Sequence, residues 1–119
     1  MTTHDEGTYA LLIYRTDQGL DAEDEARALA GHRELQATAR ADLHAVAKLD
    51  RAHTAHTVRV RGAAHAVTDG PHAEVKEWLV GFYLLDCTGL DQAIERAQTI
   101  CPVAGHAVEV RRVDWRWKS

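Results

Sequence analysis

Two places in this 119-residue sequence carry side chains that could take part in acid–base chemistry. The first is the turn Asp69-Gly70-Pro71, which leads into the apolar run 78–85. A rigid strand after such a turn can hold the polar groups of the loop in place. The second is His32, because an imidazole can gain or lose a proton near neutral pH. Both have structural explanations as well: a histidine on an apolar helix face is more often a hydrogen-bonded core residue, and Asp-Gly is a common turn.

Three other sets of residues suggest chemistry less strongly. His53 and His56 resemble a metal-ligand pair, but on an extended segment this spacing points the rings to opposite faces, so we expect no bound metal. Cys87 and Cys101 have no metal-ligand spacing and form no disulfide framework, and we expect two free thiols. The tail 115–118, Trp-Arg-Trp-Lys, could stack on bases, but a hydrophobic subunit contact explains it better.

The composition favours a single globular domain over residues 1–119. The chain is 45% apolar and 27% charged, with a formal net charge of −4. Nucleic-acid binding would require clustered lysines and arginines on a basic domain, so we expect no nucleic-acid partner. No run approaches the roughly 18 apolar residues of a membrane span, and the polar, acidic first residues do not resemble a secretion signal. We therefore expect a cytoplasmic protein without a membrane partner.

Apolar runs predict the strands that must position these residues. The runs 9–14 and 78–85 are continuously apolar, apart from Gly81, which favours strands covered on both faces. Residues 57–61 alternate strictly and can pair with residues 66–68 as a hairpin. The segment 42–51 predicts a further short strand.

Two amphipathic segments predict helices. The first begins after Asp21, a good N-cap, and reaches residue 43 with His32 at the centre of its apolar face. The second follows Thr88, which we predict to be its N-cap, and ends before Pro102. The apolar face of the first helix contains Leu29, His32, Leu35, Ala39 and Leu43, and that of the second contains Leu90, Ala93, Ile94, Ala97, Ile100 and Cys101.

The last segment alternates twice. Val108 and Val110 alternate with polar residues, and Val113 begins a second alternation that is one residue out of phase. A β-bulge near residues 111–112 would explain the change of phase.

The order of these elements predicts an α+β fold: a ferredoxin-like sandwich with a mainly antiparallel sheet and two helices on one face. The other face of the sheet then needs a cover, because the runs 9–14 and 78–85 are apolar on both alternating sets. A second copy that packs sheet to sheet would supply it. We therefore predict a homodimer through the sheet face.

These residues also carry a resemblance to a known family. The stretch from Val67 to Asp86, VTDGPHAEVKEWLVGFYLLD, with TVRVR before it and LDQAIERA and VEVR after it, resembles the DGPF subgroup of the YCII-related family. The resemblance covers nearly the whole chain. It implies a ferredoxin-like fold assembled as a dimeric α/β barrel, in agreement with the predicted order of strands and helices.

The resemblance also implies a site. Family members are thought to use a histidine and an aspartate in a pocket at the sheet, and the matching residues are His32 and Asp69. We therefore predict a hydrogen-bonded His32–Asp69 pair. The substrate would contact four further residues: Tyr14, Gly70, Pro71 and His72. The sequence departs from the family where His72 replaces a phenylalanine and Val80 a glycine, and where the carboxyl tail is extended; the first two suggest a more polar and narrower pocket.

Two functions follow from the resemblance. One is a small enzyme of lyase or isomerase type that needs no cofactor, in which His32 moves a proton next to a carbonyl or enol group of an unknown, possibly aromatic, small molecule. The other is a non-catalytic binding or regulatory module linked to a sigma factor. A pocket with convergent polar groups would favour the enzyme, and an exposed apolar patch without a pocket would favour the module.

Overall fold

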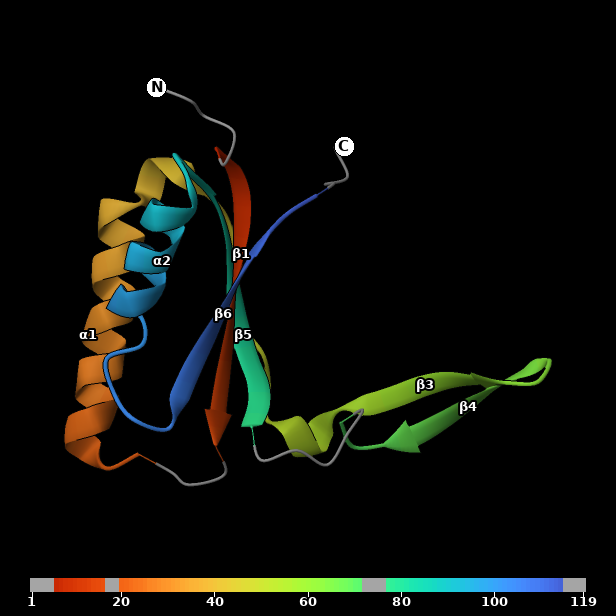
Figure 1. The fold of residues 1–119 in the computed structure, drawn as a ribbon. Coiled ribbons are helices and arrows are strands. Elements are labelled where there is room, and N and C mark those ends of the chain that lie inside the picture. Colours follow the sequence, from red (N-terminus) through yellow and green to blue (C-terminus); the bar gives the residue numbers. More distant parts are fainter. Residues whose placement is uncertain (1–5, 17–19, 72–76, 115–119) are drawn as a thin grey trace.

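The computed structural model describes residues 6–16, 20–71 and 77–114 (Figure 1). The predictions of a substrate contact at His72 and of a subunit contact at Trp115 and Trp117 therefore concern residues outside the described part of the chain. The structure contains two helices, six strands and two short 3-10 turns within this part of the chain. Their bounds are β1 Gly7–Thr16, α1 Ala22–Thr38, η1 Arg40–Asp42, β2 Leu43–Lys48, η2 Ala52–Thr54, β3 His56–Arg61, β4 Ala64–Asp69, β5 Glu77–Cys87, α2 Leu90–Thr99 and β6 His106–Arg112.

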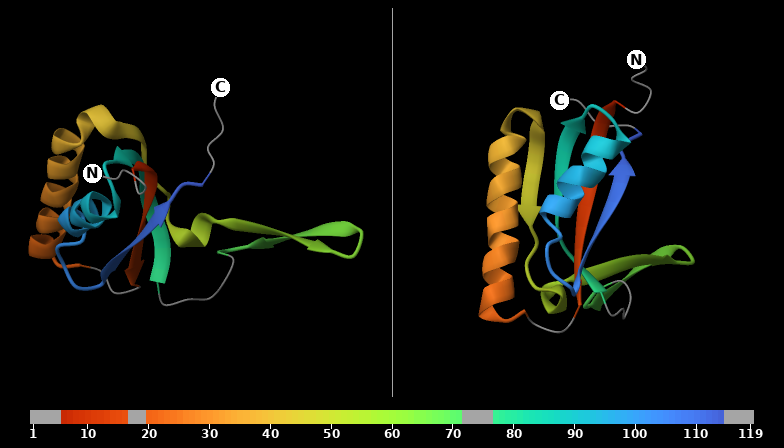
Figure 2. Two further views of the ribbon diagram at one scale, coloured as in Figure 1. Left: turned by 45° about the horizontal axis from the view of Figure 1, so that its top comes forward. Right: turned by 60° about the vertical axis from the view of Figure 1, so that its left-hand side comes forward.

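The fold is the predicted ferredoxin-like α+β sandwich. Four strands form an antiparallel sheet in the order β2-β5-β1-β6, with α1 connecting β1 to β2 and α2 connecting β5 to β6. Both helices lie on one face of this sheet (Figures 1 and 2). Strands β3 and β4 form a separate two-stranded sheet, here called the arm, which extends away from the side opposite the helices (Figure 1). No helix of the described chain is long and apolar enough to cross a membrane.

The two central strands have one buried face and one half-exposed face. On the helix side, Leu11 and Leu85 are completely buried. On the other side, here called the outer face, the side chains of β1 and β5 are only partly covered. The centre of the outer face is nevertheless apolar, and its members are Ala10, Leu12, Phe82 and Leu84 together with Ala45 and Ala47 of β2. At the β6 edge the same face carries Glu109 and Arg111, which lie opposite Leu12 and Ala10.

Each helix buries a narrower face than the sequence predicted. In α1, Ala28, Leu35 and Ala39 contact the interior, but Leu29 is 49% exposed. In α2, Ala93, Ala97 and Ile100 are buried, and Ile94 is 40% exposed. The predictions for Leu29 and Ile94 were therefore wrong. Helix α2 contacts the sheet through the small residues Ala93 and Ala97, which lets it lie close to the sheet. A larger residue beside them, such as Ile94, therefore stays partly exposed to solvent.

Two further predictions were wrong. Gly89, not Thr88, occupies the N-cap of α2, and no side chain caps this position; the backbone N–H of Thr88 instead donates to Gln92 Oε1 at 2.8 Å. The predicted bulge near residues 111–112 is absent, because the β1–β6 register runs without a shift from Arg15–His106 to Tyr9–Arg112. Register shifts occur instead on both sides of β5.

Glycine allows α1 to approach α2 closely. A Cβ atom added to Gly31 would lie 2.3 Å from the carbonyl oxygen of Thr99. Backbone atoms cannot move as easily as the end of a side chain, so any larger residue must push the two helices apart. Gly31 thus sets the position of α1, the helix that carries His32.

We predict that Gly31→Ala destabilises the protein, although an alanine inside a helix normally adds about 1 kcal/mol of stability relative to glycine. The clash with Thr99 should outweigh this gain and lower the free energy of unfolding by about 1–3 kcal/mol. Chemical denaturation measures the change. Ala30→Ser, at the exposed neighbouring position, is the control and should change stability by less than about 0.5 kcal/mol. A more stable Gly31→Ala variant would contradict the packing described here.

Candidate functional site

Helix α1 presents His32 to the sheet. Asp21 caps the helix, because its side chain accepts a hydrogen bond from the backbone N–H of Asp24 at 2.8 Å. Residues four apart lie on one side of a helix, so His32 shares its side with Ala28 and Gln36. His32 is partly buried there, between the helix and β5.

His32 and Gln36 both bind the hydroxyl group of Tyr83, a residue of β5 that is 1% exposed. The distance from His32 Nδ1 to Tyr83 Oη is 2.8 Å, and Gln36 Nε2 donates to the same oxygen at 3.1 Å. The imidazole and the phenol ring are also stacked, with centroids 5.8 Å apart and planes inclined by 2°. The three side chains form one hydrogen-bonded chain, here called the His32 cluster.

The chain of hydrogen bonds determines which nitrogen of His32 carries the proton. Gln36 donates to the hydroxyl oxygen of Tyr83, so the hydroxyl proton needs an acceptor of its own. His32 Nδ1 is the acceptor within reach, and a buried hydroxyl proton without a partner would cost about 1–3 kcal/mol. Tyr83 therefore donates to Nδ1, and the neutral imidazole carries its proton on Nε2.

Burial keeps both members of this pair uncharged at neutral pH. It lowers the pKa of His32 below its usual value of 6.5, and it raises the pKa of Tyr83 above its usual value of 10.0. The hydrogen bond from Gln36 opposes the second shift. A neutral imidazole with a fixed Nε2–H can donate a hydrogen bond to an oxygen atom of a bound molecule.

A second histidine lies near the cluster. His106 of β6 pairs with Arg15 across the β1–β6 ladder, and both of its ring nitrogens are buried without a hydrogen-bond partner among the described residues. Burial lowers the pKa of His106, the positive charge of Arg15 and, when it is protonated, that of His32 lower it further, and Glu25 opposes them. Arg15 itself donates to Glu25 at 2.9 Å and links β1 to α1.

Asp69 does not pair with His32 within this chain. It ends β4, on the arm, and its carboxylate lies 3.1 Å from His56 Nδ1 with 95% of the side chain exposed. The arm extends from the side of the sheet opposite α1, so the fold separates the two residues (Figure 2). The predicted intrachain hydrogen bond was wrong: the imidazole contacts Tyr83 instead.

The remaining predicted contact residues are also dispersed. Tyr14 lies on the outer face, where its hydroxyl donates to Glu109 Oε1 at 3.4 Å; burial, followed by the charge of Glu109, raises its pKa. Gly70 adopts a φ of +94°, which favours glycine, and its backbone N–H donates to Ala55 at the base of the arm. Pro71 follows it and lines a cavity.

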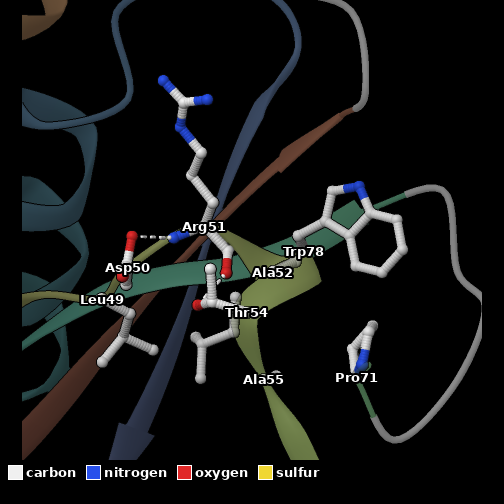
Figure 3. Close-up of a pocket in the computed structure, with 9 residues that line it drawn as sticks. Leu49, Asp50, Arg51, Ala52, Thr54, Ala55, Pro71 and Trp78 are labelled. Atoms are coloured by element: carbon white, nitrogen blue, oxygen red, sulfur yellow. Dashed lines mark hydrogen bonds between the residues drawn. The ribbon is translucent and has the colours of Figure 1, made fainter. Parts of the chain in front are cut away.

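That cavity has a volume of about 280 Å³ and lies at the base of the arm (Figure 3). Its walls are mainly apolar, and the Arg51 side chain points away from them in Figure 3. The nearby polar groups bind one another: the Arg51 backbone N–H donates to Asp50, and the Thr54 hydroxyl donates to the Arg51 carbonyl. Lining residues are Leu49, Asp50, Arg51, Ala52, Thr54, Ala55, Pro71, Trp78 and Leu79.

Within the described ranges, no three histidine, cysteine, aspartate or glutamate side chains are arranged to hold a metal ion. His56, one member of the pair considered in the sequence, binds Asp69. Cys87 is buried and Cys101 is partly buried, and both are free thiols, as predicted.

The sequence analysis missed Gln36, Tyr83 and His106. Gln36 could have been found, because it follows His32 by four residues and must lie on the same side of the helix. Tyr83 also gave a signal, since a hydroxyl in a buried strand must find a partner. Nothing in the sequence near His106 indicated that both of its ring nitrogens would be buried.

Comparison with known proteins places the chain among similar sequences. A family model described as a YCII-related domain matches residues 8–118, a range that includes both helices, the four-stranded sheet and the arm. An uncharacterized protein of Rhizobium meliloti (strain 1021) is 37% identical over an alignment of 100 residues, and the match covers 77% of this chain and 78% of that protein.

We predict that Tyr83→Phe releases His32 from its single tautomer. The variant removes the hydroxyl group and leaves the partly buried His32 Nδ1 without its partner, so the free energy of unfolding should fall by about 1–3 kcal/mol. Imidazole ¹⁵N chemical shifts should show Nε2–H in the unaltered protein and a mixture of tautomers in the variant. Tyr14→Phe, which removes an outer-face hydroxyl, is the control; an unchanged His32 spectrum in Tyr83→Phe would contradict the assignment.

We also predict that stability falls as the pH is lowered below about 6.5, the ordinary pKa of histidine. The pKa values of His32 and His106 are lowered in the folded state, so between 6.5 and those lower values the unfolded chain binds protons that the folded chain does not. Above pH 6.5 neither state binds them and the effect disappears.

His106→Leu tests this assignment. Urea denaturation between pH 5 and 8 should show a smaller loss of stability on acidification than in the unaltered protein, and greater stability throughout, because two unpartnered buried nitrogens are removed. His53→Leu changes an exposed histidine and should leave the pH dependence as it was. An equally steep pH dependence in both variants would rule out His106 as a contributor.

Proposed function

Because the chain belongs to the YCII-related family, we propose that it binds a small molecule with a carbonyl group beside His32 and promotes a lyase or isomerase reaction without a cofactor. The hydrogen-bonded chain Gln36–Tyr83–His32 carries this proposal. It fixes one tautomer of a half-buried imidazole and leaves the Nε2–H of that ring as a hydrogen-bond donor.

In this proposal His32 Nε2–H donates a hydrogen bond to the carbonyl oxygen of the substrate. When a base from the solvent takes the proton from the carbon next to the carbonyl, negative charge is left on the carbonyl oxygen, and a fixed donor in a partly dehydrated place stabilises this charge more than the neutral carbonyl. The lowered pKa of His32 keeps the ring neutral, so the donor is present throughout the neutral pH range. In this proposal Tyr83 takes the place of Asp69 as the hydrogen-bond partner of His32.

We further propose that two copies pack through their outer faces. Leu12, Phe82 and Leu84 form the apolar centre of that face, and none of them is fully covered within one chain. Two sheets of this kind commonly pack about 10 Å apart with their side chains interdigitated. This arrangement is the dimeric α/β barrel implied by the resemblance, and it leaves α1 and the His32 cluster on the outside of the assembly.

Hydrogen–deuterium exchange at carbon tests the reaction class. A panel of small 1,3-dicarbonyl and aryl ketone compounds is incubated in D₂O with the protein, and ¹H NMR follows the loss of the C–H signal next to the carbonyl. We predict faster exchange with at least one compound, and a loss of about 10²–10³-fold in His32→Ala, the range seen when one oxyanion donor is removed.

His53→Ala is the matched control, since it removes an exposed histidine far from α1 in sequence, and it should retain the full rate. Tyr83→Phe should lose part of the rate. Equal exchange by the unaltered protein and His32→Ala would reject the catalytic proposal. Saturable binding without any exchange would favour the binding module instead.

A further inference from the structure

The arm has exposed apolar side chains along one face. Directly opposite residues of an antiparallel pair share a face, so Val58 and Val67 lie together, with Val60 next to them. Their exposed fractions are 61%, 64% and 70%. Valines are expected where a strand packs against something, and nothing in the described chain covers these three.

The arm is also unsupported as a structural unit. It is a two-stranded sheet that pairs with no strand of the four-stranded sheet. At its base, hydrogen bonds from the Gly70 backbone N–H to the Ala55 carbonyl and from the Thr57 hydroxyl to the Gly70 carbonyl join the two ends of the hairpin to each other. An isolated two-stranded hairpin is marginally stable in water. The Cα radius of gyration is 16.4 Å, whereas a compact chain of this length has about 13.5 Å. The single chain is therefore more extended than its own core requires.

The arm is continuous with the outer face. Leu79 lies opposite Tyr14 on that face and also lines the cavity at the base of the arm, together with Leu49. Both leucines are about 40% exposed. Five of the nine large exposed apolar residues in the described chain thus belong to the arm or its base: Leu49, Val58, Val60, Val67 and Leu79.

We propose that the arm of each chain packs against the body of a second copy of the same chain. The sheet and the arm form an L, with the outer face as one limb and the arm as the other (Figures 1 and 2). A two-fold axis that brings two outer faces together carries both arms toward the partner, so each arm covers the partner's body while its own base is covered in return. A different protein would need one surface that fits the outer face and another that fits the arm. In a two-fold dimer, the same two surfaces of a second copy make both contacts.

This inference rests on the proposed dimer through the outer face, and it adds a second contact that can fail on its own. Sedimentation equilibrium measures the dimer dissociation constant of three variants. The arm variant is Val58→Ser, Val60→Ser and Val67→Ser combined; the face variant is Leu12→Arg; the control is Leu29→Ser and Ile94→Ser combined, which changes exposed apolar residues on the helix layer.

We expect a dimer of the 13.2 kDa chain, weakened at least about tenfold in the arm variant and unchanged in the control. The replaced valines are exposed in the single chain, and circular dichroism should confirm that the arm variant keeps the fold. Amide hydrogen exchange in β3 and β4 should be slower at protein concentrations that favour the dimer.

The outcomes separate the two proposals. A monomer at high micromolar concentration would overturn both. A dimer that Leu12→Arg dissociates, but that the arm variant leaves unchanged with no protection of β3 and β4, would overturn the arm contact and keep the dimer through the outer face. An arm variant that dissociates while Leu12→Arg stays dimeric would support the arm and reject the face.

Discussion

The buried hydroxyl of Tyr83 is the constraint on which the arrangement of helix and sheet depends. A phenol that is 1% exposed must form its hydrogen bonds inside the protein, and both of its partners come from α1. The helix therefore cannot rotate about its axis or slide along the sheet without losing them. Apolar packing at Leu35 and Ala39 would tolerate small displacements, whereas hydrogen bonds of 2.8 and 3.1 Å do not.

This constraint explains why a polar cluster stands at the boundary of an otherwise apolar core. Among the described residues, the fully buried side chains are all apolar or aromatic, and the polar groups of His32, Gln36 and Tyr83 meet between α1 and β5. Gly31 permits α1 to come close to α2 at the same level of the helix. The position of His32 thus results from one polar and one steric requirement acting on neighbouring residues.

The sequence predicted the order of strands and helices because those signals are local. Continuous apolar runs marked β1 and β5, alternation marked β3, and an N-cap with acidic residues marked the start of α1. The sequence predicted contacts between distant segments less accurately. Asp69 sits in a turn of ordinary type, and only the path of the chain decides that this turn belongs to the arm and not to the His32 cluster.

The errors in the helices have the same origin. Ile94 belongs to the apolar stripe of α2 by periodicity, but a helix that contacts its sheet through alanines needs only a narrow stripe, and the remaining apolar residues stay exposed. Likewise, periodicity located the apolar face of α1 correctly at His32 and Leu35, yet it could not define the edge that leaves Leu29 outside. The width of a contact depends on the partner surface, which the helix sequence does not contain.

The central place of β1 has a consequence for synthesis on the ribosome. Strand β1 is hydrogen-bonded on both sides, by β5 and β6, and both lie in the second half of the sequence. At about 5–20 residues per second, the run from Tyr9 to Ile13 waits several seconds for its first neighbour to be translated. During that time α1 can cover one face of this apolar strand, but both of its edges still lack a hydrogen-bonded neighbour. Both edges of β1 therefore stay unpaired until residues 77–112 have been translated, which leaves this strand open to pairing with other chains during synthesis.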